Sequence, residues 1–251
     1  MMDINNLMDN DNIRVVEQQG NISVLEYIKD LSCPLEHAVL YHYASLMNIR
    51  RRQTLLELKN DSYVLSAGAM QWMAGNIQME SDVKGVGDFM GKALKGLVTG
   101  EAPSKPIYKG EGYLMLEPTY KHLLIEEVSN WDGGLVMEDG MFLACQGSLH
   151  HTVVKRDNMS SVFAGEGLFN MALSGKGLAV LESNVPRSEL IEVVLDNEEI
   201  KIDGSYAICW SNSLKLTVET STKGLINSAV SGEGFVNVYR GTGRILMAPL
   251  Q

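Results

Sequence analysis

The five histidines are the side chains of this chain best suited to bind a metal, and their spacing predicts no metal centre. They are His37, His42, His122, His150 and His151, and they lack the His-x-His motif with a later Glu and His that cupin-type metalloenzymes use. His150 and His151 are adjacent, so on a strand they face opposite ways and cannot easily share one ion. We expect no metal or other cofactor, and the sequence assigns this pair no role.

Phosphate-binding loops and nucleophiles are not indicated either. Residues 85–92 superficially resemble a phosphate loop, but Val86 stands where the first glycine is required and Ala93 replaces the required Ser or Thr. Ser148 and Ser174 lie beside glycines without the sequence of a nucleophile elbow. The sequence therefore predicts no catalytic residues and favours a protein that is not an enzyme.

The charge of the chain argues against nucleic acid as a partner. The 251 residues contain 21 Lys and Arg against 31 Asp and Glu, a formal net charge of −10, which repels a phosphate backbone. The densest basic run is Arg50-Arg51-Arg52. We interpret this run as the solvated entrance of a strand rather than as an anion site.

Cysteine usage and the first residues predict a cytoplasmic protein. Cys33, Cys145 and Cys209 lie far apart, and their odd number argues for buried thiols in a reducing compartment rather than for a disulfide framework. The opening residues, MMDINNLMDNDN, lack the features of a secretory signal or a mitochondrial presequence. No apolar stretch approaches the roughly 20 residues that span a bilayer.

Three similar stretches repeat along the chain. Gly68, Gly140 and Gly204 each precede a short apolar strand, a turn and a second strand, and a Gly-Glu-Gly tripeptide follows downstream each time. Paired glycines favour tight turns or bulges, because glycine reaches positive φ without steric cost. We predict structural turn glycines at Gly68, Gly110, Gly112, Gly140, Gly165, Gly167, Gly175, Gly177, Gly204, Gly232, Gly234, Gly241 and Gly243. The glutamates inside the tripeptides are expected in solvent.

The repeats and the alternating segments, such as residues 214–219, predict an all-β fold. We divide the chain into an N-terminal segment, residues 1–54, and a β domain, residues 55–251, which together form one compact unit. The β domain consists of three diverged repeats, about 55–130, 131–195 and 196–251. One or two short helices are expected, at 34–47, which opens with Pro34, and at 85–98.

The segment GAMQWMAG, the tripeptides and the closing GEGFVNVYRGTGRILMAP resemble the altered-inheritance-of-mitochondria protein twenty-four family. The resemblance runs from about Leu55 to the carboxyl end, and Thr242 stands where the family often has a proline. It implies a double-stranded β-helix, a β-sandwich similar to the tryptophan RNA-binding attenuation protein, and no established reaction. Mitochondrial members are linked to inner-membrane organisation, a role that we do not transfer to a chain without a presequence.

An insert at residues 81–105 makes the first repeat longer than the other two. Its apolar side chains and neighbouring lysines could dock on a protein partner or an anionic membrane surface; the alternative is a loop that covers the chain's own sheet or a neighbouring subunit. The side chains that we expect to dock are Phe89, Met90, Leu94 and Leu97.

Two classes of function stay open at this point. The sequence favours a non-catalytic oligomeric scaffold or binding protein, and the alternative is a small-ligand-binding protein or an enzyme with a pocket between its sheets. Unpaired strand edges are commonly covered by self-association. We therefore expect a homo-oligomer, preferably a trimer, because three units in one chain can extend their own pseudo-symmetry.

Overall fold

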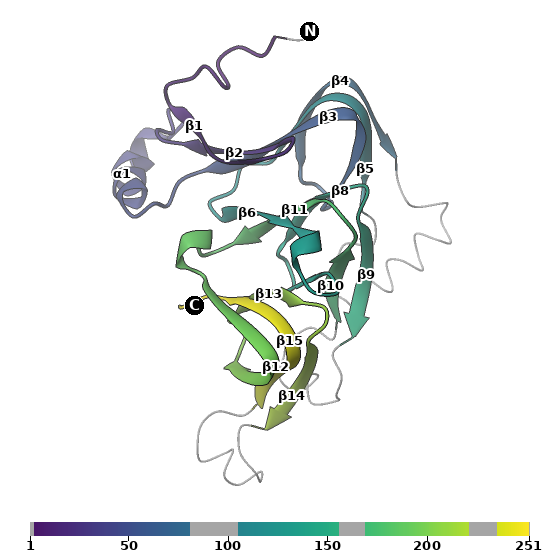
Figure 1. Cartoon of the computed structure of the whole chain (residues 1–251). Coiled ribbons are helices and arrows are strands. Elements are labelled where there is room, and N and C mark those ends of the chain that lie inside the picture. Colours follow the sequence, from purple (N-terminus) through teal and green to yellow (C-terminus); the bar gives the residue numbers. More distant parts are fainter. Residues whose placement is uncertain (1–2, 81–104, 156–168, 221–234, 251) are drawn as a thin grey trace, which may run out of the picture.

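The computed structural model describes residues 3–80, 105–155, 169–220 and 235–250 of the chain, and its regular structure is almost entirely β-strand (Figure 1). The predicted all-β class is confirmed. The first sheet has eight strands: β1 (Ile13–Gln19), β2 (Ile22–Tyr27), β3 (Arg52–Leu65), β8 (Phe142–Gln146), β11 (Leu178–Ser183) and β6 (His122–Glu127) in spatial order, with β5 (Ile107–Leu116) beside β3 and β4 (Met70–Glu80) beside β5. The second sheet has seven: β12 (Ile191–Asp203), β15 (Phe235–Met247), β13 (Ala207–Ser211), β7 (Leu135–Met137), β10 (Phe169–Ser174) and β9 (His150–Lys155), with β14 (Lys215–Thr220) beside β15.

The two sheets share one buried apolar cluster, and each sheet also has a buried apolar cluster of its own. Leu181 of the first sheet and Leu135, Leu173 and Leu246 of the second belong to the same buried cluster. The sheets curl, and β1 contacts β6, so the two ends of the first sheet approach each other (Figure 1). The N-terminal segment is part of this sheet, because β2 pairs antiparallel with β3.

The predicted turn glycines that lie in the described residues all have positive φ. They are Gly68, Gly110, Gly112, Gly140, Gly175, Gly177, Gly204, Gly241 and Gly243. Gly165, Gly167, Gly232 and Gly234 lie outside the described residues.

Two of the glycine pairs occupy equivalent positions in the paired strands. The pair Gly110 and Gly112 lies inside β5, opposite a register shift in β3, and Gly241 and Gly243 lie inside β15, opposite a register shift in β12. Among the described residues, the first tripeptide therefore corresponds in position to Gly241–Gly243. Glu111, between the first pair, is exposed.

The predicted helix at 34–47 is confirmed as a short 3-10 turn, η1 (Leu35–His37), followed by α1 (Ala38–Leu46). Pro34 precedes the turn with an extended backbone, and Asn48 follows with φ of 60°, a conformation that asparagine tolerates better than most residues at a helix end. The second predicted helix, at 85–98, lies outside the described residues. None of the helices in the described part of the chain is long and apolar enough to cross a membrane.

Candidate binding site at the base of the helical arm

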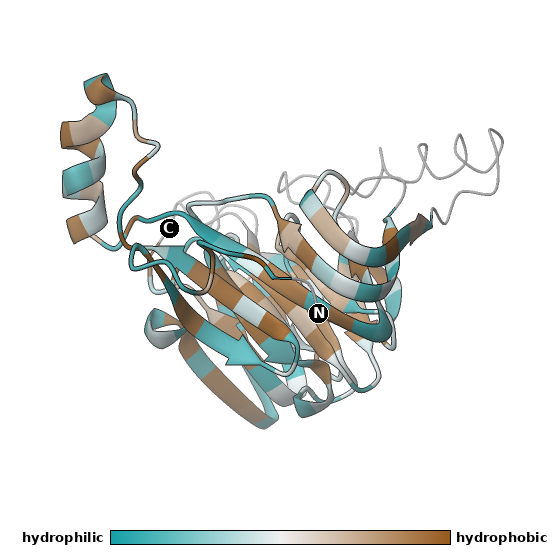
Figure 2. Cartoon of the chain, turned by 90° about the horizontal axis from the view of Figure 1, so that it is seen from above, coloured by the Kyte–Doolittle hydropathy of each residue, from teal (hydrophilic) through white to brown (hydrophobic). Residues whose placement is uncertain are grey.

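The connection between β2 and β3, residues 28–51, forms an arm that carries α1. No residue of α1 is buried, and Figure 2 shows the helix standing apart from the two sheets. A helix of nine residues is marginal in water without tertiary contacts. The helix of the arm is therefore little stabilised by packing against the core.

One face of this helix is apolar and points into solvent. Leu35 is 90% exposed and Met47 is 77% exposed, and Val39, Tyr43 and Leu46 recur at i, i+4 and i+7 with about two thirds of their surface exposed. This spacing is typical of the stripe that a surface helix turns toward a core. We call Leu35, Val39, Leu40, Tyr43, Leu46 and Met47 the apolar stripe.

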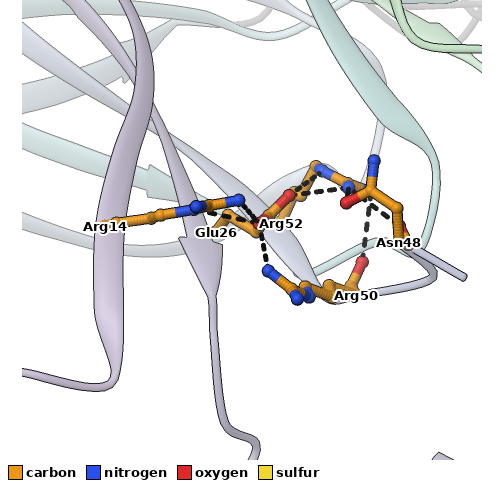
Figure 3. Close-up of polar contacts among 5 residues, drawn as sticks. All are labelled: Arg14, Glu26, Asn48, Arg50 and Arg52. Carbon is orange, nitrogen blue, oxygen red and sulfur yellow. Dashed lines mark hydrogen bonds and ion pairs between the residues drawn. The ribbon is translucent and has the colours of Figure 1, made fainter. Parts of the chain in front are cut away.

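A buried ionic cluster holds the base of the arm (Figure 3). Glu26 and Arg52 have side chains only 3% exposed, with Arg52 Nη2 2.7 Å from Glu26 Oε2. Arg14 Nη2 and Arg50 Nη1 lie 2.6 and 3.1 Å from Glu26 Oε1. Arg52 Nη2 also donates to the main-chain oxygen of Asn48 at 3.0 Å. Three guanidinium groups thus share one carboxylate, and one of them ties the end of the arm to β3.

Strand register explains why these side chains meet. Arg14 of β1 is the Cα partner of Glu26 in β2, and Glu26 is in turn the partner of Arg52 in β3. Directly opposed side chains in an antiparallel pair lie close enough to interact. The cluster is therefore one row of residues across three neighbouring strands, joined by Arg50 from the arm.

The arginines of the cluster stabilise the ionised form of the Glu26 carboxyl group. Burial on its own raises the pKa of Glu26, but hydrogen bonds from Arg14 and Arg52, with the charge of Arg52, hold that pKa below its ordinary value. The expectation that the Arg50-Arg51-Arg52 run is solvated is wrong for Arg52, which is 2% exposed. A buried guanidinium needs a paired carboxylate, and Glu26, 26 residues earlier in the chain, provides it.

A cavity of about 260 Å³ lies between the arm and the edge of the first sheet. Tyr41 of α1 and Tyr120, which precedes β6, face each other with ring centroids 6.3 Å apart. Arg51 Nε donates to Tyr120 Oη at 3.1 Å and lies 3.1 Å from Asp30 Oδ2. A hydrogen bond with Tyr120 raises the pKa of Tyr41, although Arg51 opposes that shift.

A second groove, of about 300 Å³, lies on the other side of the cluster, where β1 approaches β6. Its walls include Arg14, Glu17, Arg52 and His122. Burial raises the pKa of Glu17, and burial together with the charge of Arg52 lowers the pKa of His122. At neutral pH His122 is thus the uncharged member of a charged wall.

These side chains offer charge and hydrogen bonding to a ligand. Among the described residues no group of three or more His, Cys, Asp or Glu could hold a metal ion. Cys145 and Cys209 are buried, as predicted, whereas Cys33 is partly exposed beside the cavity. His150 and His151 lie on β9 and are exposed, and Phe89, Met90, Leu94 and Leu97 lie outside the described residues.

Sequence reasoning did not single out Arg14, Glu26 or Tyr120. No local motif marks them, because they come from strands and turns that only the sheet register brings together. The Arg50-Arg51-Arg52 run was the one available signal, and the sequence did not indicate that Glu26 lies opposite Arg52.

Comparisons with known proteins identify the fold family. A family model described as "Mitochondrial biogenesis AIM24" matches residues 48–250. An uncharacterised protein of Streptococcus pyogenes serotype M6 is 26% identical over 196 residues, which cover 75% of this chain and 77% of that protein. The crystal structure of a Streptococcus pyogenes protein is similar with a TM-score of 0.59 and 26% identity, covering 81% of this chain and 89% of that one. Glu26 and α1 precede the residues that the family model matches.

Proposed function

We propose that this chain, which belongs to the family described as mitochondrial biogenesis AIM24, is a non-catalytic binding protein that assembles with further copies of itself through the arm. The observation that carries the proposal is the apolar stripe of α1, which has the spacing of a buried helix face and is exposed. The ion pairs of Glu26 with three arginines at the base of the arm hold the helix in position.

The size of the stripe suits a protein interface. Its six side chains are between 64% and 90% exposed. Together they offer about 800 Å² per copy, which equals the roughly 800 Å² per partner of a stable interface. Burial of that surface is favourable by about 25 cal/mol per Å² before the costs of association.

A second copy fits this surface better than a membrane does. Interfacial membrane helices are rich in Lys and Arg on their polar face, whereas η1 and α1 contain neither and carry the acidic Glu36. The whole chain has a formal charge of −10, which opposes approach to anionic lipid. In the described residues β4 pairs only with β5, and β12 only with β15, so long strand edges are also left for a neighbouring copy to cover.

The stoichiometry that we propose is a trimer in the cytoplasm. It is supported by the resemblance of three segments, 52–116, 122–183 and 191–247, in each of which a first strand and a hairpin strand both pair with a returning strand. In the middle segment β6 and β7 stand in place of one long first strand, and β10 and β11 stand in place of one returning strand. With these segments as the repeat units, the boundaries would differ from the units at about 55–130, 131–195 and 196–251 that the sequence predicts. Docking through residues 81–105 stays a prediction.

Light scattering of the full chain tests assembly. We expect Tyr43→Glu to convert the oligomer to the 27.6 kDa monomer with an unchanged circular dichroism spectrum, because a charge in a closed apolar interface is costly. Met8→Glu is the matched control, since Met8 is also exposed, at 55%, but lies off the arm; it should leave the oligomer intact. A wild-type protein that is monomeric at micromolar concentration would refute the proposal.

A further inference from the structure

We propose that the cavity between the arm and the first sheet binds a small organic anion with a flat apolar body. Three cationic side chains line it, Lys29, Arg50 and Arg51, against a single carboxylate, Asp30. The cavity therefore carries an excess of positive charge in a chain whose overall charge is −10. This binding site is separate from the apolar stripe, which lies on the outer face of α1.

Arg50 has an unused donor at this place. Its Nη1 lies 3.1 Å from Glu26 Oε1, but that carboxylate is shared with Arg14 and Arg52 and cannot neutralise all three. Its Nε is buried and has no hydrogen-bond partner among the described residues. A buried donor without a partner costs about 1 to 3 kcal/mol, so an anionic oxygen that reached it would remove a penalty as well as add an attraction.

Aromatic and aliphatic groups make up most of the remaining wall. Tyr27, Tyr41 and Tyr120 line the cavity together with Ala44 and Ile49. Arg51 lies over the Tyr120 ring, with its guanidinium carbon 5.5 Å from the ring centroid, so the cation is held in place beside an apolar surface. A ligand with one ring would contact these walls while its charged group faced the arginines.

The volume limits the size of the ligand. Pockets for drug-sized molecules are roughly 300 to 1,000 Å³, and this cavity is about 260 Å³. A monocyclic carboxylate or phosphate monoester has the right size and charge. A polymer such as nucleic acid does not fit a cavity closed on one side by α1.

Calorimetric titration of the full chain with phenyl phosphate and with benzoate tests the site, with benzyl alcohol as the neutral probe. We expect one of the two anions to bind with a Kd below about 1 mM and benzyl alcohol to bind at least about tenfold more weakly. Arg50→Gln should weaken the anion about 10- to 100-fold, because a hydrogen bond to a charged group is lost. Ala44→Leu, which fills the cavity without changing its charge, should have a similar effect.

Arg14→Gln is the matched control. Arg14 and Arg50 donate to the same oxygen of Glu26, but Arg14 lies in the second groove and not in this cavity. We expect Arg14→Gln to change the Kd by less than about threefold. The proposal is overturned if neither anion binds, if benzyl alcohol binds equally well, or if Arg14→Gln weakens binding as much as Arg50→Gln. Tyr43→Glu should retain binding, so failure of assembly and failure of this site are distinguishable.

Discussion

Glu26 and Arg52 lie opposite each other on neighbouring strands and form an ion pair in which each side chain is 97% buried, 2.7 Å between Oε2 and Nη2. A pair this deep contributes little net free energy relative to apolar residues of the same shape, but losing one partner leaves the other charge uncompensated. The cluster therefore fixes where the arm leaves the sheet more than it adds to stability.

Glu26→Gln should destabilise the protein by about 3 to 5 kcal/mol, because three guanidinium groups then lack a counter-charge. Arg14→Gln should cost less than about 1 kcal/mol, since the Arg14 side chain is 50% exposed and water screens its charge. Urea unfolding of both variants at pH 7 measures the difference. Equal and small losses would mean that the arginines are solvated after all.

Ionisation of Glu26 should also make the free energy of unfolding depend on pH in the acid range. The folded-state pKa of Glu26 is lowered below 4.5, so its ionisation stabilises the fold above that value, and this stabilisation is lost as the pH falls through the folded pKa. Wild type and Glu26→Gln should therefore differ most near pH 6 and converge in strong acid. Unfolding free energies at intervals between pH 7 and pH 3 give the comparison. A difference that stayed constant with pH would assign the effect to packing instead.

The three cysteines should separate by reactivity. Burial raises the pKa of Cys145 to about 12 and that of Cys209 well above its ordinary value, so neither forms a thiolate near neutral pH. Cys33 is partly exposed, although burial of its thiol and the charge of Asp30 raise its pKa as well. Ellman's reagent at pH 8 should modify one thiol in the native protein and three in urea. The folded Cys33→Ser variant should not react with the reagent. Rapid reaction of a second thiol in the folded wild-type protein would contradict the burial of Cys145 and Cys209.

Local patterns in the sequence identified the elements of this fold more readily than their partners. Glycine at Gly68 or Gly140 marks a turn because few other residues adopt its positive φ, and Pro34 with apolar residues after it marks the short helix. Such signals act over a few residues. They are enough for an all-β architecture and for the arm.

The candidate site needed information that no single stretch contains. Whether Arg52 is solvated or buried depends on whether a carboxylate lies opposite, and that depends on the registers of β1 with β2 and of β2 with β3. The later Gly-Glu-Gly tripeptides lie outside the described residues, so their alignment with Gly110 stays a prediction. Within the described strands, Gly110 and Gly112 in β5 take the place that Gly241 and Gly243 take in β15, each pair opposite a register shift in the partner strand.

The close contact of β4 with β5 gives the last prediction. Gly112 is the Cα partner of Gly75, and a Cβ at Gly112 would lie 2.1 Å from the main-chain oxygen of Ala74. Backbone cannot move aside as a flexible side chain can, and the φ of 146° at Gly112 is itself unfavourable for a residue with a Cβ. Gly112→Ala should therefore cost more than about 4 kcal/mol, which is exceptional for a point substitution.

Gly140→Ala provides the control for that substitution. Gly140 has φ of 74°, but nothing lies within 4 Å of the position its Cβ would take. Only the backbone cost of a left-handed alanine applies there, about 1 to 2 kcal/mol. Urea unfolding of the two variants separates conformational strain from the steric clash between strands. If Gly112→Ala were no more destabilising than Gly140→Ala, β4 and β5 would have room to separate at this point, and the bend would not depend on the facing glycines.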